Sequence, residues 1–211
     1  MLRVKDFSLS TPNKTLIEAL SFDIEKGQVL SLMGPSGIGK SSLLHYLSGH
    51  LANSLQATGE VFLDDISLHD KPAEQRKVGL LQQSPLLFPH MSIMENLLFA
   101  IPENKPKKVR KALAIEALEK LKIRDKANAL PNELSGGQQA RVALLRTLLA
   151  EPNYLLLDEP FSKLDPALRR DVRAFVLTEI RQANIPALLV THDEKDAEAM
   201  EGNSLYLSPL I

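Results

Sequence analysis

Alternating apolar and polar residues mark the first part of the chain as strands. Three segments with this period-two pattern precede residue 35, and Gly27 marks a turn between the last two. A helical segment follows, and then two more segments with strand character. The predicted elements are strands at 2–10, 17–25, 28–34, 59–65 and 77–83, and a helix at 40–51. We expect the N-terminal strands to be antiparallel.

The pattern changes at residue 84, where helical spacing replaces the alternation. Val109, Leu113, Ala117 and Leu121 stand four residues apart, which is typical of one face of a helix. This character continues to about residue 150. We therefore expect residues 84–150 to form a helical insertion, with these four side chains on its packed face.

Near-continuous apolar runs return in the last third of the chain. The runs at 153–160 and 185–193 are typical of strands whose two faces are both covered, and a helix is predicted between them at 167–183. A closing strand is expected within 203–210. Strands that alternate with helices predict an α/β fold with a mainly parallel sheet. We expect one domain over residues 1–211, with a core of 1–83 and 151–211 and a helical subdomain at about 84–150.

Composition excludes several classes of protein. The 211 residues carry a formal net charge of −1, so no global charge favours nucleic acid, and the absence of cysteine excludes disulfides and thiol chemistry. The basic run at 105–111 is interpreted as a solvated helix face, so no nucleic-acid partner is expected. The N-terminus lacks a signal-peptide pattern and no apolar run is long enough to span a bilayer, which predicts a soluble cytoplasmic protein.

A glycine-rich loop between a predicted strand and a predicted helix carries the first candidate site. The stretch GPSGIGKSS fits the pattern G-x-x-x-x-G-K-[ST]. Successive backbone N–H groups and a helix N-terminus form a nest for phosphate oxygens, a lysine adds charge on the β and γ phosphates, and a serine hydroxyl can bind Mg²⁺. The predicted nucleotide-binding residues are Gly34, Pro35, Ser36, Gly37, Ile38, Gly39, Lys40, Ser41 and Ser42, with Ser41 also a metal ligand.

Two acids end the apolar strand at 153–160. Ligands bind at the carboxyl ends of parallel strands, so Asp158 is placed to hold Mg²⁺, through a water molecule, and Glu159 to act as general base or to orient the attacking water. A phosphoryl-transfer kinase has no need to activate water. The pair therefore favours hydrolysis of a nucleoside triphosphate over phosphoryl transfer.

A second anion-binding motif, LSGGQ, begins at Leu134. Ser135 is a good helix N-cap, Gly136 and Gly137 allow close backbone approach to an anion, and the helix that follows directs its positive end there. Together with the glycine-rich loop, LLLDEP and VTHD, this motif resembles the ATP-binding cassette (ABC) ATPases over essentially the whole chain. In that family two subunits pack head to tail, and the LSGGQ signature of one contacts the ATP held by the other.

The resemblance implies further site residues. Gln83 matches the glutamine that meets Mg²⁺ and the water, with Gln82 as the alternative one residue out of register. His192 matches the histidine on the γ-phosphate, Gln138 completes the signature, and Asp165 lies in the loop that crosses the dimer interface. Residues 84–99 resemble the surface that receives a membrane subunit.

The family's adenine-stacking aromatic residue has no clear counterpart. Its position falls near Thr11, where there is no ring. Phe7 is the nearest aromatic residue, but it stands where core residues of the first strand are expected. We therefore expect Phe7 to be buried and base selectivity to be weak.

The resemblance is greatest to short ATPase subunits of bacterial importers. It implies an ATP-hydrolysing motor that uses ATP and Mg²⁺, lies peripherally at the cytoplasmic face of the cell membrane, and drives import of a small solute. The implied partners are transmembrane permease subunits, a solute-binding protein and a second cassette, either a copy of this chain or a paired subunit. Alternatives are a soluble ABC ATPase of DNA repair or the ribosome, and a small P-loop kinase.

Overall fold

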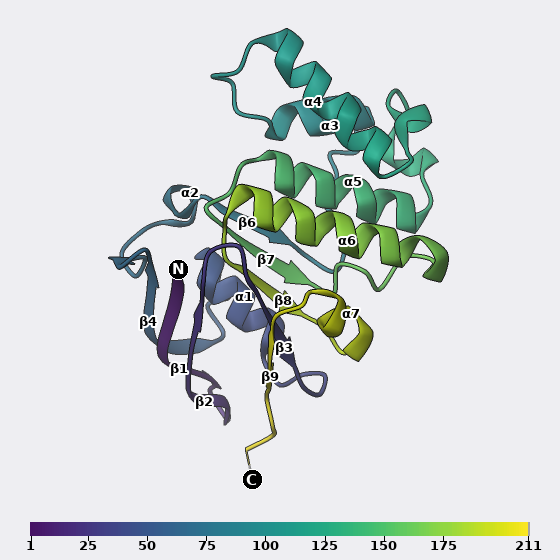
Figure 1. Cartoon of the computed structure of the whole chain (residues 1–211). Helices are drawn as coiled ribbons and strands as arrows, with labels where there is room; N and C mark the ends of the chain where they lie inside the picture. Colours follow the sequence, from purple (N-terminus) through teal and green to yellow (C-terminus); the bar gives the residue numbers. More distant parts are fainter. Residues whose placement is uncertain (211) are drawn as a thin grey trace.

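The computed structural model describes residues 1–210 and holds two sheets (Figure 1). The antiparallel sheet contains, in spatial order, β2 (Lys14–Ile24), β1 (Leu2–Thr11), β4 (Gln56–Leu63) and β5 (Ile66–Ser67). The other sheet contains β6 (Val78–Leu81), β7 (Tyr154–Asp158), β8 (Ala187–Val190), β3 (Val29–Met33) and β9 (Asn203–Tyr206). All four pairings within this second sheet are parallel. The predicted α/β class, with antiparallel N-terminal strands, is confirmed.

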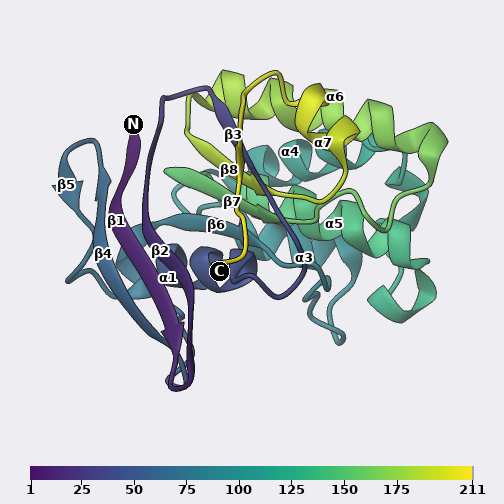
Figure 2. The same cartoon turned by 90° about the horizontal axis from the view of Figure 1, so that it is seen from below.

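The helices cover both faces of the parallel sheet. The longer ones are α1 (Lys40–Ser48), α3 (Ile93–Ala100), α4 (Lys107–Lys120), α5 (Gly136–Leu149) and α6 (Pro166–Ala183). The short ones are α2 (Ala73–Arg76), α7 (Glu194–Ala199) and the 3-10 turns Arg124–Lys126 and Pro131–Glu133. Figure 2 shows the antiparallel sheet standing to one side of the parallel one, with α1 close to both.

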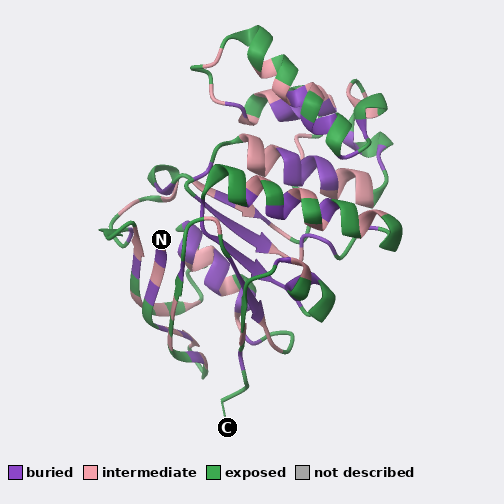
Figure 3. Ribbon diagram, viewed as in Figure 1, coloured by how far each residue is buried: buried purple, intermediate pink, exposed green. Residues whose placement is uncertain are grey.

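Alternate residues of each central strand feed two separate cores. On β7, Leu155 and Leu157 belong to a cluster with α3 to α6, whereas Tyr154 and Leu156 belong to a cluster with α1 and the antiparallel sheet. Side chains alternate between the faces of a strand, so strands covered on both faces are buried throughout. Figure 3 shows this as purple along the central strands β3, β7 and β8.

Tyr154, the first residue of β7, is hydrogen-bonded to the last turn of α1. Its ring is fully buried, and its hydroxyl donates to the carbonyl of Leu47 at 2.9 Å. Burial raises the pKa of Tyr154 to about 12, and the nearby Arg76 opposes this shift.

One detail of the expected helical insertion needs correction, namely which side chains form the packed face of its helix. In α4 the buried face is formed by Ala114, Ala117 and Leu118, followed by Leu121, while Val109 is 45% exposed. A helix face repeats every 3.6 residues, so steps of strictly four drift off it over three turns. The helix α5 packs on α3 and α4 and also contacts β6 of the core.

Candidate functional site

The loop between β3 and α1 forms the first anion-binding nest. Gly34, Gly37 and Gly39 all have φ between 79° and 143°, a region that residues with a Cβ rarely adopt. At Gly39 a Cβ would also stand 2.8 Å from Leu9. The first turn of α1 has no side-chain cap. Its N–H groups have no carbonyl ahead of them in the helix, so they are available to a phosphate.

Lys40 closes this loop from inside. Its Nζ donates to the carbonyls of Gly34 at 2.7 Å and Pro35 at 2.8 Å, and the residue is only 8% exposed. Burial lowers the pKa of Lys40, while the carboxylates of Glu159 and Asp158 raise it. The two carboxylates therefore only partly offset the cost of burying the Lys40 ammonium group, and a bound phosphate would supply further negative charge.

A cavity of about 310 Å³ opens beside the loop. Its lining brings together residues from five separate segments: Leu16, Ser36, Gly37, Gly39, Lys40, Ser41, Ser42, Gln83, Asp158, Glu159 and Val190. Burial raises the pKa of Asp158, the Ser41 side chain opposes this by hydrogen bonding, and Glu159 adds to the rise. A cation beside Asp158 would offset the cost of keeping this carboxylate ionised.

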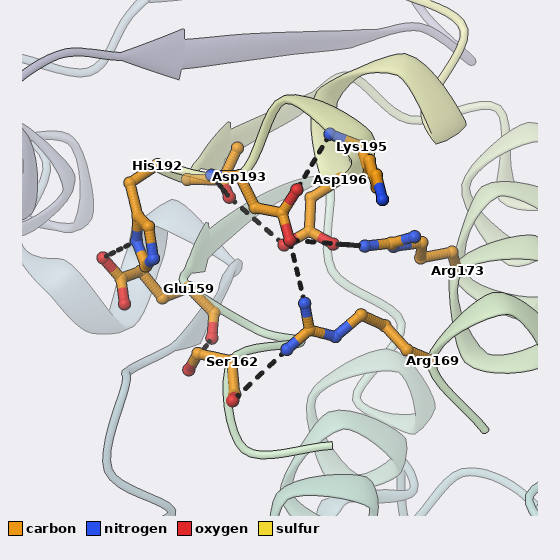
Figure 4. A network of polar contacts seen from close by, with 9 residues as sticks. Glu159, Ser162, Arg169, Arg173, His192, Asp193, Lys195 and Asp196 are labelled. Atoms are coloured by element: carbon orange, nitrogen blue, oxygen red, sulfur yellow. Dashed lines mark hydrogen bonds and ion pairs between the residues drawn. The ribbon is translucent and has the colours of Figure 1, made fainter. Parts of the chain in front are cut away.

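Glu159 is held from two sides at the mouth of the cavity. Its Oε2 accepts a hydrogen bond from Nε2 of Gln83 at 3.0 Å. Its Oε1 lies 2.9 Å from Nδ1 of His192, a contact drawn in Figure 4. The Glu159 backbone has φ of 47°, and its N–H donates to Val190. Left-handed backbone at a residue other than glycine is uncommon and gathers at functional sites.

The structure distinguishes between the two candidate glutamines. The Gln82 side chain lies 3.5 Å from His45, whereas Gln83 contacts Glu159 and lines the cavity. Gln83 is thus the glutamine that faces the site, in the register expected from the sequence.

The second anion-binding motif begins α5 and lies apart from the cavity. The Ser135 hydroxyl oxygen accepts a hydrogen bond from the backbone N–H of Gln138 at 3.3 Å, and the Ser135 N–H donates to Oε1 of Gln138 at 2.9 Å. A Cβ added to Gly136 would meet nothing within 4 Å. Neither these residues nor Gly137 and Asp165 line the cavity. Asp165 instead caps α6, accepting from the backbone of Leu168 at 3.0 Å.

Comparison with known proteins decides the family. The profile described as ABC transporter matches residues 17–162, a span that includes both motifs and the acids after β7. The chain belongs to the ABC transporter family. As an ABC ATPase it binds ATP with Mg²⁺ and hydrolyses the nucleotide.

Several relatives extend over most of this ABC ATPase. The uncharacterized ABC transporter ATP-binding protein YnjD of Escherichia coli (strain K12) is 45% identical over 94% of this chain and 92% of its own length. The spermidine/putrescine import ATP-binding protein PotA of Vibrio cholerae serotype O1 is 36% identical over 98% of this chain. This chain spans only 54% of that protein. A dimeric, post-hydrolysis structure of the ATP-binding cassette MJ0796, bound to ADP and Pi, matches with a TM-score of 0.84 at 28% identity, over 99% of this chain and 94% of that one.

The donor set fits MgATP. Within residues 1–210 no group of three or more His, Cys, Asp or Glu side chains forms a metal cage. Mg²⁺ is commonly held by one or two protein groups together with substrate phosphates and water. Ser41, Gln83 and Asp158 all line the cavity beside the phosphate nest, as such a shared site requires.

No aromatic side chain lines the cavity of this ABC ATPase. Phe7 is fully buried, with its ring 4.9 Å from that of Tyr46, so the expectation that it is a core residue is confirmed. Thr11 Oγ1 accepts from the N–H of Lys14 at 3.0 Å in the β1–β2 hairpin. Leu16 is the apolar residue that β2 contributes to the cavity, and sequence analysis missed it because only its neighbours in space distinguish it from other strand leucines.

Sequence analysis also missed two arginines on α6. Arg169 pairs with Asp193 at 2.9 Å, and Nε of Arg173 donates to Asp196 at 2.6 Å. Arginines on an amphipathic helix look like surface residues in the sequence. Only the return of the chain after β8 reveals their partners.

Proposed function

We propose that the chain is the ATPase motor of an importer, working as a head-to-tail dimer at the cytoplasmic face of the cell membrane. It drives a small solute through separate transmembrane permease subunits, with a solute-binding protein delivering the cargo. Relatives named as spermidine/putrescine and Fe(3+) import proteins support this direction of transport. They also favour a role in transport over a role in DNA repair or on the ribosome. Within residues 1–210 no helix is long and apolar enough to cross a membrane, so the route itself is assigned to the permease subunits.

The exposed N-terminus of α5 is the observation that supports a dimer. Ser135 and Gly136 are exposed, and the 14-residue helix directs its N–H groups at no ligand site of its own chain. A helix N-terminus with two glycines favours an anion. A second copy, packed head to tail, supplies that anion as the γ-phosphate of its own ATP.

The cavity residues then divide the work. Lys40 and the backbone amides from Gly37 to Ser41 would bind the β and γ phosphates, and Ser41, Gln83 and Asp158 would hold Mg²⁺. The metal, when bound, neutralises charge that develops on the phosphates. Glu159 accepts a proton from the attacking water, in an orientation that Gln83 and His192 fix by hydrogen bonds. His192 also contacts the γ-phosphate.

A groove beside α3 supports the docking of a membrane subunit. A cavity of about 510 Å³ there is lined by Met91, Glu95, Leu98, Phe99, Ala100, Ile101, Pro102, Glu103 and Arg110. Phe99 is 63% exposed, and its ring stacks edge-on against Phe88 at 4.8 Å. Phe88 lies five residues after Gln83, so a partner in this groove can move the loop that carries the glutamine.

Trapping the dimer tests the central claim. Glu159→Gln keeps the shape of the side chain and removes the base, so bound ATP should persist and hold two copies together. Size-exclusion chromatography with MgATP should show a dimer that reverts to monomer when EDTA removes Mg²⁺. A saturated, ATP-bound monomer at high protein concentration would contradict the proposed assembly.

A negative charge at Phe99, which lines the groove, or at Phe88, whose ring packs against it, tests docking. Phe88→Asp, or Phe99→Asp at the more exposed ring, should leave ATP binding intact and uncouple hydrolysis from transport in the assembled importer. Val109→Asp places the same charge on an exposed residue outside this groove and serves as the control. Normal transport in both phenylalanine variants would refute docking at this surface.

A further inference from the structure

Glu159 and His192 meet although they come from different loops. Glu159 follows β7 and His192 follows β8, and their side chains lie 2.9 Å apart. The His192 side chain is 68% exposed, so packing does not fix its place. Something beyond the strands must hold the two loops in register.

Arg169 contacts both loops from the first turn of α6. Its NH1 donates to Oδ2 of Asp193 at 2.9 Å, and its NH2 makes a longer contact of 3.4 Å to the carbonyl of Ser162. Asp193 is the residue after His192. Ser162 reaches back to Glu159, because its hydroxyl donates to the Glu159 carbonyl at 2.9 Å.

These contacts close a ring. It runs from Glu159 through Ser162, Arg169, Asp193 and His192 back to Glu159, as Figure 4 shows. We propose that Arg169 is a positioning residue that sets the geometry of the Glu159–His192 pair, an inference that rests on the roles proposed for that pair in ATP hydrolysis. A guanidinium group is suited to this because its donors form a rigid planar fork.

Stability alone does not explain the placement of Arg169. Its Nε is buried without a hydrogen-bond partner within residues 1–210, an arrangement that costs stability. Asp193 would keep other partners without it, since Asp193 also accepts from the N–H of Lys195 at 2.9 Å and lies 3.8 Å from Arg173.

Arg173 has the opposite profile. Its partner Asp196 is 3% exposed and also accepts from the hydroxyl of Thr191 at 3.2 Å. Loss of Arg173 leaves a buried carboxylate without its counter-charge, which is strongly destabilising. Arg173 therefore anchors the fold of this region, while Arg169 aligns the two loops.

The test compares Arg169→Gln, Arg169→Lys and the control Arg170→Gln, which removes the same charge from an exposed neighbour on α6. In the full chain, Arg169→Gln should lower kcat by about tenfold or more, since small displacements of positioned groups are costly. KM and the Kd for MgATP should stay within about twofold of wild type. Arg169→Lys should recover part of kcat, and Arg170→Gln should match wild type.

Two readouts separate positioning from general loosening. Hydrogen exchange in the nucleotide-free chain should speed up together at residues 159–165 and 191–196 in Arg169→Gln, with α6 still protected. Asp193→Asn keeps the helix cap and removes the charge, so its effect on kcat and that of Arg169→Gln should be strongly non-additive. Arg173→Gln should lower the melting temperature far more than Arg169→Gln.

Glu159→Gln, measured in parallel, distinguishes failure of this inference from failure of the proposed function. If Glu159→Gln retains turnover, the role assigned to Glu159 is wrong. If Glu159→Gln is inactive while Arg169→Gln keeps wild-type kcat, the positioning role is overturned. The positioning role is also overturned if Arg169→Gln weakens nucleotide binding by as large a factor as it lowers kcat and lowers the melting temperature as much as Arg173→Gln does.

Discussion

The N-termini of α1 and α5 are both built for phosphate, yet they differ in how far their own chain completes them. The α1 terminus lies in a cavity that holds its own buried Lys40 together with two carboxylates and a glutamine from two other segments. The α5 terminus is exposed, and Gly136 has nothing near its missing side chain. The loop before α1 is thus completed by its own chain, whereas the proposed dimer would complete the α5 terminus with a second molecule.

The two termini also differ in what stabilises them without ligand. In α1 no side chain caps the N-terminus of the helix, and the Lys40 ammonium group donates hydrogen bonds to two carbonyls of its own loop. In α5 Ser135 and Gln138 form a reciprocal cap. The loop before α1 therefore has unsatisfied groups that nucleotide would satisfy, whereas the N-terminus of α5 is already capped by side chains of its own chain.

The largest effects, on nucleotide binding and turnover, are expected from two single variants, one that disrupts the α1 terminus and one that disrupts the α5 terminus. Lys40→Ala should weaken MgATP binding by roughly 10- to 100-fold through loss of charge-assisted hydrogen bonds. Gly136→Asp should bind ATP normally and lose about 100-fold or more in turnover, because it sets a negative charge against the partner's phosphate. ATPase assays and nucleotide titrations measure both.

Mixing these two variants sharpens the comparison. A mixed dimer contains one site with an intact α1 loop and an intact α5 terminus, so an equal mixture should recover roughly a quarter of wild-type turnover. Gly136→Asp alone should keep its melting temperature, since Gly136 is exposed and a Cβ added there meets nothing within 4 Å. No recovery on mixing, with both variants folded, would mean that the termini do not meet across subunits.

A moderate effect on stability is expected from alanine at one glycine of each terminus. Gly39→Ala forces a side chain into φ of 105° and toward Leu9, so it should destabilise the chain by about 1–3 kcal/mol and weaken nucleotide binding. Gly136→Ala should instead stabilise the fold by up to ~1 kcal/mol. Urea unfolding measures both, and equal losses at the two positions would show that the α5 terminus is as constrained as the loop before α1.

The smallest effect concerns the base. The cavity offers Leu16 and no ring, and loss of one stacked aromatic residue costs on the order of 1 kcal/mol, or a several-fold change in affinity. GTP should therefore bind nearly as well as ATP, and Thr11→Tyr should tighten ATP if Thr11 stands at the stacking position. Calorimetric titration of wild type, Thr11→Tyr and Phe7→Ala decides this, and strong ATP preference that Phe7→Ala abolishes would contradict it.

Periodicity predicted most of the fold because burial imposes it directly. The central strands are covered on both faces and show up as apolar runs, and helices such as α6 show a clear apolar stripe. The two-residue strand β5 and the four-residue helix α2 were missed, since such short elements carry too few residues for a period. The packing of α5 on β6 was missed because a sequence shows that a helix face is buried and does not show what covers it.

The candidate site was predictable where the chemistry is local. The loop before α1 places its glycines, Lys40 and Ser41 within one short stretch, and Asp158 and Glu159 are adjacent. Gln83 and His192 were placed only through family resemblance, and the structure now brings both onto Glu159. Arg169 could not be found in this way, because its two contacts join loops that lie apart in the sequence.

The buried hydroxyl of Tyr154 gives the protein an internal optical reporter. The chain has three tyrosines and no tryptophan, and the pKa of Tyr154 is raised to about 12 by burial. The folded-state pKa of Tyr154 lies above the unfolded value of about 10, so the fold favours the protonated hydroxyl. The contribution of Tyr154 to the free energy of unfolding is therefore fully present below pH ~10 and is lost as the pH rises toward 12. Burial also raises the pKa of Tyr46, so the Tyr154 phenolate is followed as the difference in absorbance between wild type and Tyr154→Phe. This difference should emerge together with loss of helical circular dichroism, and it follows the junction of β7 and α1 without any label.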